Sequence, residues 1–261
     1  MRHRYCYLYL FHILFLLCSC SSRQQDHVRQ STATDAVYTD STTVATLPSP
    51  ARSESSRQQK SRTALCLDSL GFVNIAEADS TIAVDLMYTR AENFTGTILY
   101  EDLKEAYLHP EAMESLSRAQ RLLKERHPGY SLIIYDAARP MSVQQKMWDV
   151  VKGTPKYIYV SNPARGGGLH NYGLAVDISI LDEEGNPLPM GTPVDHLGRE
   201  AHITEEARLV AQGKITEAER ENRLLLRQVM KEAGFRPLPS EWWHFNRVSR
   251  QTAKEKYRLI P

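Results

Sequence analysis

The polar tract over residues 21–62 decides how much of this chain can fold. Ser, Thr, Gln, Arg and Asp dominate the tract, and large apolar side chains are almost absent from it. Such a composition cannot bury enough apolar surface to offset the entropy lost when a backbone is ordered. We therefore expect a disordered tether over residues 21–62 and one folded domain over residues 63–261, a length that suits a single core.

The N-terminal end has the pattern of an export signal. Arg2 and Arg4 precede an apolar run over residues 5–17, and the run is followed by Cys18-Ser19-Cys20. The run is too short to cross a hydrocarbon core of about 30 Å as a permanent helix. Its ending resembles a bacterial lipobox, which implies cleavage before Cys20 and acylation of that thiol; an ordinary signal peptide cut nearby is the alternative. Residues 1–20 are thus expected to export the protein and anchor it to a bacterial membrane, on the periplasmic or cell-surface side.

Charge and cysteine content narrow the class of protein further. The 32 basic and 31 acidic residues nearly cancel, so no basic field is available to recruit nucleic acid. Of the four cysteines, only Cys66 lies beyond the expected signal and lipidation site, and an internal disulfide is therefore excluded. No histidine lies near Cys66, so we interpret it as a structural residue rather than a nucleophile. The domain must be stabilised by its core and by any bound metal.

Hydrophobic periodicity predicts short strands interspersed with helices. The expected strands cover residues 81–88, 131–136, 174–181 and 243–248. The expected helices run from His109-Pro110-Glu111 to residue 127, from Ser142 (with Gln145 as a capping box) to about 152, and from Thr216 to near 234. Because these elements do not alternate as regular βαβ units, we predict a compact α+β domain with a small, largely antiparallel sheet flanked by helices.

Two short clusters supply metal-ligand chemistry. His170 and Asp177 are joined across Gly173, and Asp177 falls on the alternate face of an apolar strand, where an unpaired carboxylate is costly. Glu241-Trp-Trp-His244 adds a second imidazole and a spare carboxylate. Either cluster alone also fits an ordinary structural role. Together, two histidines and one aspartate leave a fourth tetrahedral position open, as catalytic zinc sites do, so we predict one Zn²⁺ on His170, Asp177 and His244.

Two further side chains suit hydrolysis at such a centre. Zinc lowers the pKa of a bound water from about 15.7 to about 7, and Glu241 can take the proton that the water loses. Arg139 follows the strand that ends at Asp136, and it can hold a carbonyl oxygen that becomes an oxyanion. Without these companions, Arg139 reads as a surface arginine at a turn.

These motifs resemble those of the M15 metallopeptidases. The pattern His-x-x-Gly-x-Ala-x-Asp over residues 170–177, with Glu-x-x-His far downstream at residues 241–244, resembles the metal-binding motifs of that family. Residues 84–96, which end in Asn-Phe-Thr-Gly, and the Pro-Met-Gly segment ending at Asp195 resemble the D-alanyl-D-alanine dipeptidase branch, the VanX type. The likeness covers most of residues 82–247. It implies the α+β fold of the M15 and Hedgehog DD-peptidases.

The resemblance also implies roles for individual residues. Glu241 would be the general base and later the acid, and Arg139 would stabilise the oxyanion. Asp195 would receive the ammonium group of the substrate, and Tyr88 would line the pocket. The chain departs from the vancomycin-resistance enzymes at two places. Ala137-Ala138 stand where those enzymes have Gly-Tyr, and Gly168 stands where they have serine. Both positions are expected near the pocket, so they bear on the preferred substrate and not on the metal chemistry.

The function expected from these observations is zinc-dependent hydrolysis of D-alanyl-D-alanine to two D-alanines. The alternative within the same superfamily is a D,D- or L,D-carboxypeptidase or endopeptidase that acts on peptidoglycan stem peptides. A wall-binding module that holds a metal without turnover is a different class, and Glu241 argues against it. Because an exported enzyme cannot reach the cytoplasmic dipeptide pool, we expect a role in scavenging or wall turnover rather than in vancomycin resistance.

Overall fold

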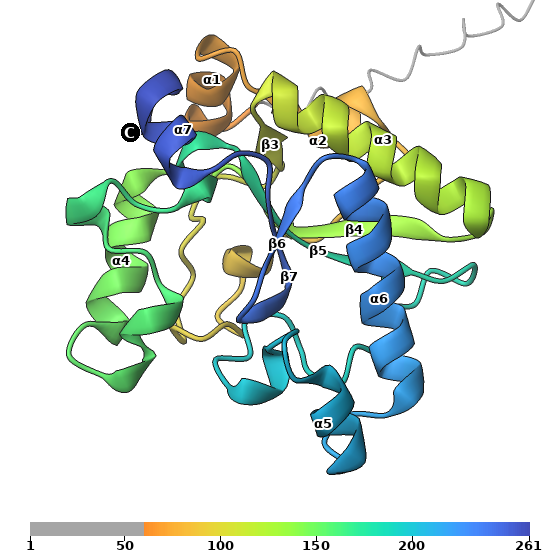
Figure 1. Ribbon diagram of the computed structural model, residues 1–261. Coiled ribbons are helices and arrows are strands. Elements are labelled where there is room, and N and C mark those ends of the chain that lie inside the picture. The colour runs from red at the N-terminus through yellow and green to blue at the C-terminus, as the bar shows by residue number, and fades with distance from the viewer. Residues whose placement is uncertain (1–59) are drawn as a thin grey trace, which may run out of the picture. The chain divides into compact units, whose positions relative to one another are not determined.

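A five-stranded mixed sheet in the order β2-β4-β5-β7-β6 lies at the centre of the computed structural model, which describes residues 60–261 (Figure 1). The strands of this sheet are β2 (Ala83–Val84), β4 (Ser131–Asp136), β5 (Ala175–Leu181), β6 (Arg236–Leu238) and β7 (Glu241–Asn246). β2 pairs with β4 in parallel, and the other three pairings are antiparallel. Strands β1 (Val73–Asn74) and β3 (Tyr107–Leu108) form a separate antiparallel pair. The predicted α+β fold with a largely antiparallel sheet is confirmed.

Helices surround the sheet and connect its strands. The α-helices are α1 (Arg62–Ser69), α2 (Ile75–Ala78), α3 (Pro110–Arg126), α4 (Met141–Val151), α5 (Glu206–Ala211), α6 (Glu217–Glu232) and α7 (Arg250–Lys256). The 3₁₀ helices are η1 (Met87–Thr89), η2 (Pro155–Tyr159), η3 (Pro163–Arg165), η4 (Leu169–Tyr172) and η5 (Arg199–Ala201). No helix within residues 60–261 is both long enough and apolar enough to cross a membrane.

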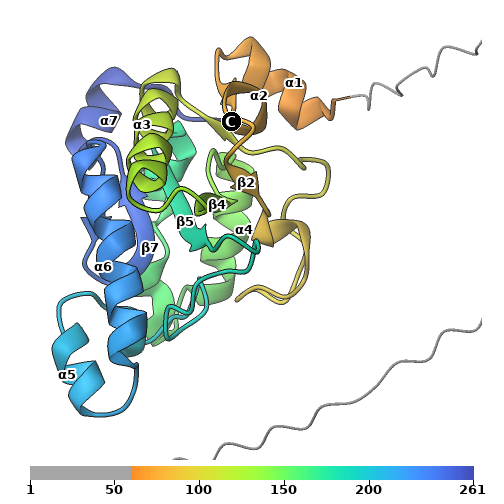
Figure 2. The same cartoon turned by 90° about the vertical axis from the view of Figure 1, so that its right-hand side faces the viewer.

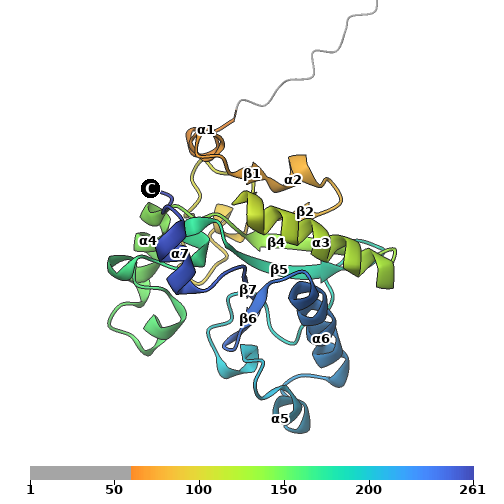
Figure 3. The same ribbon diagram turned by 45° about the horizontal axis from the view of Figure 1, so that its top comes forward.

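Helices α3 and α6 cover one face of the sheet and lie against each other (Figure 2). Their inward side chains, such as Leu116 and Leu123 from α3 and Leu226 and Met230 from α6, are fully buried. Strand β5 lies in the middle of the sheet, and both of its faces are buried as far as Ile180. Figure 3 shows the order of the strands, with α1, β1 and α2 together beyond the β2 edge. The opposite face of the sheet is left for the loops that build the pocket.

The helix ends explain why two predicted helices form where they do. His109 caps α3 by accepting a hydrogen bond from the Glu111 backbone N–H, and Pro110 occupies the first turn, where its missing N–H costs nothing. At α6, the Thr216 side chain accepts from the Glu219 N–H, and the Glu219 carboxylate accepts from the Thr216 N–H. This reciprocal pair is the predicted capping box.

Two details of the sequence prediction are wrong. The strand expected over residues 81–88 covers only Ala83–Val84, and Tyr88 lies in η1. At Tyr88 the chain no longer pairs with β4, because the Tyr88 carbonyl accepts hydrogen bonds from the N–H groups of Leu99 and Tyr100 instead. The capping box expected at Ser142 is absent, because α4 begins at Met141. Pro140 starts that helix with its fixed φ, and no side chain caps it.

The two ends of the described chain lie close to α4. Helix α1 begins at Arg62, one residue before the predicted domain boundary, and carries the exposed Cys66. Near the C-terminus, the Ile260 carbonyl accepts from the Met141 N–H, and the Ile260 N–H donates to the Asn171 carbonyl. Residues 1–59 lie outside the described part of the chain, so the structure does not test the export signal, lipidation at Cys20 or most of the predicted tether.

Candidate active site and metal centre

The three predicted metal ligands meet on the open face of the sheet, although they come from three different elements. His170 lies in η4, Asp177 lies in the middle of β5, and His244 lies on β7 directly opposite Asp177 in the strand register. Directly paired residues of an antiparallel ladder point to the same face. The register therefore brings Asp177 and His244 together. His170 reaches them because the chain turns between η4 and β5.

Gly173 makes that turn possible. It ends η4 with φ +63°, a left-handed conformation that glycine adopts without strain. A Cβ atom at this position would lie 2.3 Å from the Phe72 ring and 3.0 Å from the His109 backbone nitrogen. The close approach of these neighbours and the positive φ both require glycine. The sequence prediction that Gly173 lets the two ligands converge fits this geometry.

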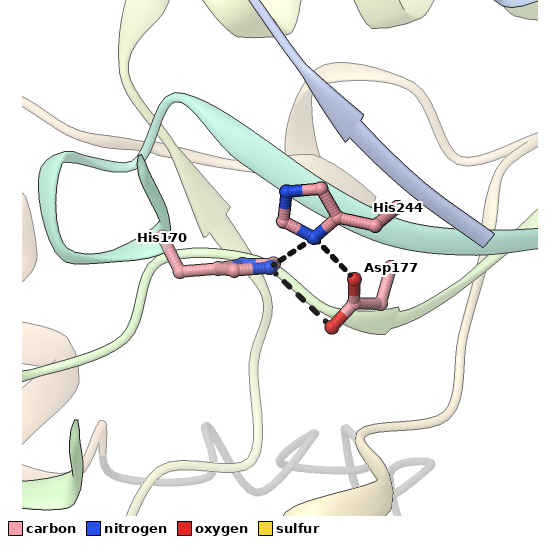
Figure 4. Close-up of side chains that lie close together, drawn as sticks. All are labelled: His170, Asp177 and His244. Atoms are coloured by element: carbon pink, nitrogen blue, oxygen red, sulfur yellow. Dashed lines mark hydrogen bonds and ion pairs between the residues drawn. The ribbon is translucent and has the colours of Figure 1, made fainter. Parts of the chain in front are cut away.

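Figure 4 shows the side chains of His170, Asp177 and His244 pointing toward one another. His244 Nδ1 lies 2.9 Å from Asp177 Oδ1, His170 Nε2 lies 3.3 Å from Asp177 Oδ2, and the two imidazole nitrogens are 3.2 Å apart. One ligand atom from each residue lies within 4.8 Å of the others. Among the described residues this is the one such group of three or more His, Cys, Asp or Glu side chains.

The hydrogen bonds behind the two imidazoles show that this set fits a cation. His170 Nδ1 donates to the Ala137 carbonyl at 2.7 Å, and His244 Nε2 donates to Asn246 Oδ1 at 2.9 Å. In neutral rings, the nitrogens that face each other then carry lone pairs and no proton. Two lone pairs and a carboxylate directed at one point repel one another unless a positive charge lies between them. The donor set of two nitrogens and one carboxylate oxygen therefore suits a metal ion.

Charge around Asp177 agrees with this assignment. Burial alone would raise the pKa of its carboxyl, but where protons take the place of a metal ion between the ligands, the charge and hydrogen bonds of His170 and His244 hold that pKa well below its usual range. Asp177 is therefore ionised at every physiological pH and available as a ligand.

Arg139 is held beside the three ligands by a buried network. Its Nε donates to Asp136 Oδ2 at 2.9 Å, its Nη2 donates to the same oxygen, and its Nη1 donates to Gln144 Oε1 at 2.9 Å. Nη2 also lies 3.7 Å from Asp177 Oδ2, and the guanidinium carbon lies 5.3 Å from the centre of the Tyr88 ring. The sequence prediction of a cation at this point of the pocket agrees with the geometry, and the fixed guanidinium is preorganised for a developing negative charge.

Glu241 begins β7, and its carboxyl points into the same pocket. Its Oε2 lies 3.9 Å from His244 Nδ1, and the side chain is almost completely buried. Burial raises the pKa of this carboxyl to about 8, although the nearby His244 opposes the shift. A carboxyl with its pKa raised toward neutrality can both accept and return a proton near pH 7.

Asp195 and Tyr88 form the far side of the pocket. The Tyr88 hydroxyl donates to Asp195 Oδ2 at 2.5 Å, and Asp195 has φ +62°, the one positive φ among the described non-glycine residues. Although Asp195 as a whole is half-buried, burial of its carboxyl and the charge of Asp177 raise its pKa to about 7. A strained backbone that carries a buried acid is typical of a functional position.

Several pocket residues were missed by the sequence prediction. They join the predicted residues in lining one cavity of about 380 Å³: Gln144, Tyr159, Ser161, Arg236, Asn246 and Arg250. Strand alternation could have revealed Asn246, which lies two residues after His244 and so on the same face. Gln144 lies in α4, Arg250 begins α7, and the others come from η2, the loop after it and the edge strand β6. Periodicity indicates which face of such an element is buried, but not which of its polar side chains enters a pocket. Beside this cavity, His202 is half-buried, and its Nε2 lies 3.2 Å from the Tyr159 hydroxyl.

The two departures from the vancomycin-resistance pattern lie in or beside this pocket. Ala137 and Ala138 are buried, and the Ala137 carbonyl orients His170. Gly168 caps η4 and lines the pocket, and a Cβ atom there would lie 3.0 Å from the Ser161 hydroxyl oxygen. Ser161 thus occupies the space into which a side chain at position 168 would point.

Comparison with known proteins shows the family of the chain. The model of the M15 peptidase family described as D-ala-D-ala dipeptidase matches residues 68–259. The D-alanyl-D-alanine dipeptidase of Escherichia coli (strain K12) is 31% identical over 178 residues, which cover 68% of this chain and 85% of that relative. The protein of the same name from Synechocystis sp. is 28% identical and covers 56% and 71% of the two chains, and that from Enterococcus faecium is 27% identical and covers 67% and 91%.

Proposed function

The chain belongs to the M15 peptidase family and is a metallopeptidase, and on that premise we propose that it hydrolyses D-alanyl-D-alanine to two D-alanines with one zinc ion. The observation that carries the metal part is the pair of imidazole nitrogens, His170 Nε2 and His244 Nδ1, that face each other at 3.2 Å beside the Asp177 carboxylate. Dipeptidase relatives at 26–31% identity support the substrate class.

His170, Asp177 and His244 would hold the ion. Zinc supplies Lewis acidity at this point, which lowers the pKa of water and polarises the scissile carbonyl. Glu241 accepts the proton of the attacking water and delivers it to the leaving amine, since its carboxyl lies beside the ligands and its pKa is raised. Arg139 donates to the carbonyl oxygen as negative charge develops there.

Asp195 would bind the free ammonium group of the substrate. Its carboxylate closes the side of the pocket next to Tyr88, and the Tyr88 hydroxyl fixes its orientation. A buried negative charge at this place favours a substrate with a free amino terminus and disfavours an acylated one, because the acyl group leaves the carboxylate unpaired. This distinction separates a dipeptidase from a carboxypeptidase or endopeptidase acting on stem peptides.

For the physiological role we propose release of D-alanine outside the cytoplasmic membrane, by an enzyme that is exported and anchored through lipid on Cys20. The apolar run before Cys20 and the polar tract after it support this location. An enzyme placed there would act on fragments of the wall and not on cytoplasmic precursors.

Removal of the Glu241 carboxyl tests the catalytic part of the proposal. In the zinc-loaded protein, Glu241→Gln should lower kcat for D-alanyl-D-alanine by roughly 10²–10⁴-fold, because proton transfer loses its carrier. The bound zinc per chain, measured by atomic emission, should stay that of the wild type, since Glu241 is not among the three ligands. Glu232→Gln on the exposed side of α6 is the matched control and should retain full activity.

A panel of substrates tests the specificity. Free D-alanyl-D-alanine should be cleaved, and N-acetyl-D-alanyl-D-alanine and acylated stem peptides should not. Faster cleavage of the acetylated compounds would instead identify a carboxypeptidase or endopeptidase. Zinc binding without cleavage of any compound would identify a binding module.

A further inference from the structure

The pocket has a basic side that the proposed mechanism leaves unused. The acidic side lies near β4, where Tyr88 of η1 holds Asp195 and where Arg139 is neutralised by Asp136. Beyond β7, Arg236 lines the pocket from β6, and Arg250 lines it from the start of α7, the helix that lies against η4. The cavity thus runs across the sheet from a buried carboxyl, over the three ligand residues, to a pair of guanidinium groups.

The strand register fixes the direction in which Arg236 points. Arg236 lies on the edge strand β6, directly opposite Asn246 of β7. Asn246 shares the face of His244, as its hydrogen bond to His244 Nε2 requires. Residues paired directly across antiparallel strands share a face, so Arg236 projects from the face that carries the ligands. Neighbouring strands are about 4.8 Å apart, which places its backbone one strand beyond that of His244.

Neither arginine has a carboxylate partner within residues 60–261. Arg236 makes no hydrogen bond or ion pair to any side chain there, and Arg250 donates only to the Arg165 carbonyl, at 3.2 Å. Of the thirteen other described arginines outside the pocket, seven have an acidic partner: Arg90, Arg126, Arg208, Arg220, Arg223, Arg227 and Arg247. Two guanidinium groups that line one pocket with no carboxylate paired to either are free to bind an anion of the ligand.

We propose that Arg236 and Arg250 bind the carboxylate of the residue that follows the scissile bond, an inference that rests on the proposed dipeptidase function. With the ammonium at Asp195 and the reacting carbonyl at the ligand residues, this carboxylate lies one residue further, about 3.8 Å along the chain. The charges of the substrate then match those of the pocket, because Asp195 faces the ammonium group and the two guanidinium groups face the carboxylate. The pair selects a peptide whose C-terminus is free and ends one residue after the cleaved bond.

A comparison of acid and amide substrates tests this assignment. The wild type should prefer D-alanyl-D-alanine to its C-terminal amide by at least tenfold in kcat/KM. In the double variant Arg236→Gln/Arg250→Gln, kcat/KM for the acid should fall by roughly 10–100-fold, mainly through KM, and the value for the amide should stay unchanged. The acid-to-amide ratio should therefore approach one. Arg208→Gln on α5, an exposed arginine paired with Glu205, is the matched control and should keep the wild-type ratio.

Reversing the charge at position 236 tests the same contact independently. Arg236→Glu should lower cleavage of the free acid and raise cleavage of a dipeptide whose C-terminus carries an aminoethyl amide, a cation. Circular dichroism and the thermal midpoint establish that each variant is folded, which is expected because Arg236 and Arg250 are exposed. An acid-to-amide ratio that is the same in the wild type and the double variant would overturn the proposal.

Binding measurements separate this proposal from the proposed function. Calorimetric titration of zinc-loaded Glu241→Gln with the dipeptide acid and with its amide reports the carboxylate contact without any turnover. If the dipeptide is not cleaved but still binds better as the acid, and the two arginine substitutions abolish that preference, the dipeptidase function fails and the anion site stands. Equal binding of the acid and the amide refutes the anion site, whatever the enzyme cleaves.

Discussion

The buried carboxyl groups of the pocket differ in their pKa values, and the differences separate their roles. Two neighbouring imidazoles keep Asp177 ionised, burial raises the pKa of Glu241 to about 8, and burial with the charge of Asp177 raises that of Asp195 to about 7. An acid that stays charged suits a metal ligand, and one that titrates near neutrality suits proton transfer. Asp195 titrates too, but it lies at the end of the pocket, where it would change the charge offered to the substrate.

The raised pKa of Asp195 makes the stability of the metal-free protein depend on pH. The ordinary value is 3.8 and the folded value is about 7, so between these pH values the unfolded chain has lost a proton that the folded protein retains. Folding therefore becomes less favourable as pH rises through this window, by up to roughly 1.4 kcal/mol per pH unit, and levels off above it. Asp195→Asn cannot titrate, tolerates the positive φ and can still accept from Tyr88. Relative to this variant, the wild type should lose stability from pH 4.5 to 7 in urea unfolding.

The difference in stability between the wild type and Asp195→Asn cancels the contribution of every other titrating group, because both proteins contain those groups. The same variant bound to zinc should bind D-alanyl-D-alanine more weakly, because the ammonium loses its counter-charge. A wild type and an Asp195→Asn variant whose stabilities change in parallel with pH would show that the carboxyl ionises in the folded protein as it does in the unfolded chain.

At the scale of elements, the pairing of β5 with β7 does most to assemble the site. Alternation along residues 174–181 was enough to predict that Asp177 lies apart from the apolar side chains of its strand, and the Glu241–His244 spacing was enough to predict a second cluster. The register that sets His244 opposite Asp177 could not be predicted, because it depends on how two segments 67 residues apart pair. The family motifs supplied that link where periodicity could not.

The strands that sequence reasoning missed share one physical reason. Strands β1, β3 and β6 contain two or three residues, too few for an alternation to show. The capping box at Ser142 failed because Pro140 starts α4 earlier, and the strand over residues 81–88 ended early because Tyr88 turns away into the pocket. Arg236 was missed for the same reason as β6. The metal ligands, Asp195 and Tyr88 belong to motifs that the sequence displays, whereas Arg236 belongs to none of them.

Substitution of Gly173 tests how strictly the turn between η4 and β5 is required. Gly173→Ala places a methyl group against the Phe72 ring at a positive φ, whereas Gly185→Ala at φ +82° meets nothing within 4 Å. The left-handed backbone alone costs about 1–2 kcal/mol, and overpacking at Gly173 adds roughly 1–3 kcal/mol. In urea unfolding Gly173→Ala should be the less stable of the two by at least about 1 kcal/mol. It should also bind zinc more weakly, because His170 shifts. Equal stabilities would show that Phe72 moves aside freely.

At the scale of the whole molecule, location decides which substrate pool the enzyme meets. Residues 60–261 contain the site and the sheet that supports it. The site therefore needs no residue of the preceding segment, for which we propose a role in localisation. An enzyme in the cytoplasm would intercept dipeptide before it enters wall precursors. An enzyme tethered outside the membrane would meet only fragments released from the wall, and the D-alanine it releases would be available for uptake.

The predicted lipid anchor can be tested at a single atom, the Cys20 sulfur. Each acyl CH₂ buried in a membrane contributes about 0.8 kcal/mol of binding, so an acylated protein partitions into detergent and a protein without acyl chains stays in water. Wild-type protein from cells fed labelled palmitate should carry the label and enter the detergent phase of a Triton X-114 separation. Cys20→Ala should do neither, and Cys66→Ala, which removes the exposed thiol of α1, should behave as the wild type does. Wild-type protein recovered unlabelled from the cytosolic fraction would refute the anchor and return the enzyme to the cytoplasmic dipeptide pool, leaving the zinc site and its chemistry untouched.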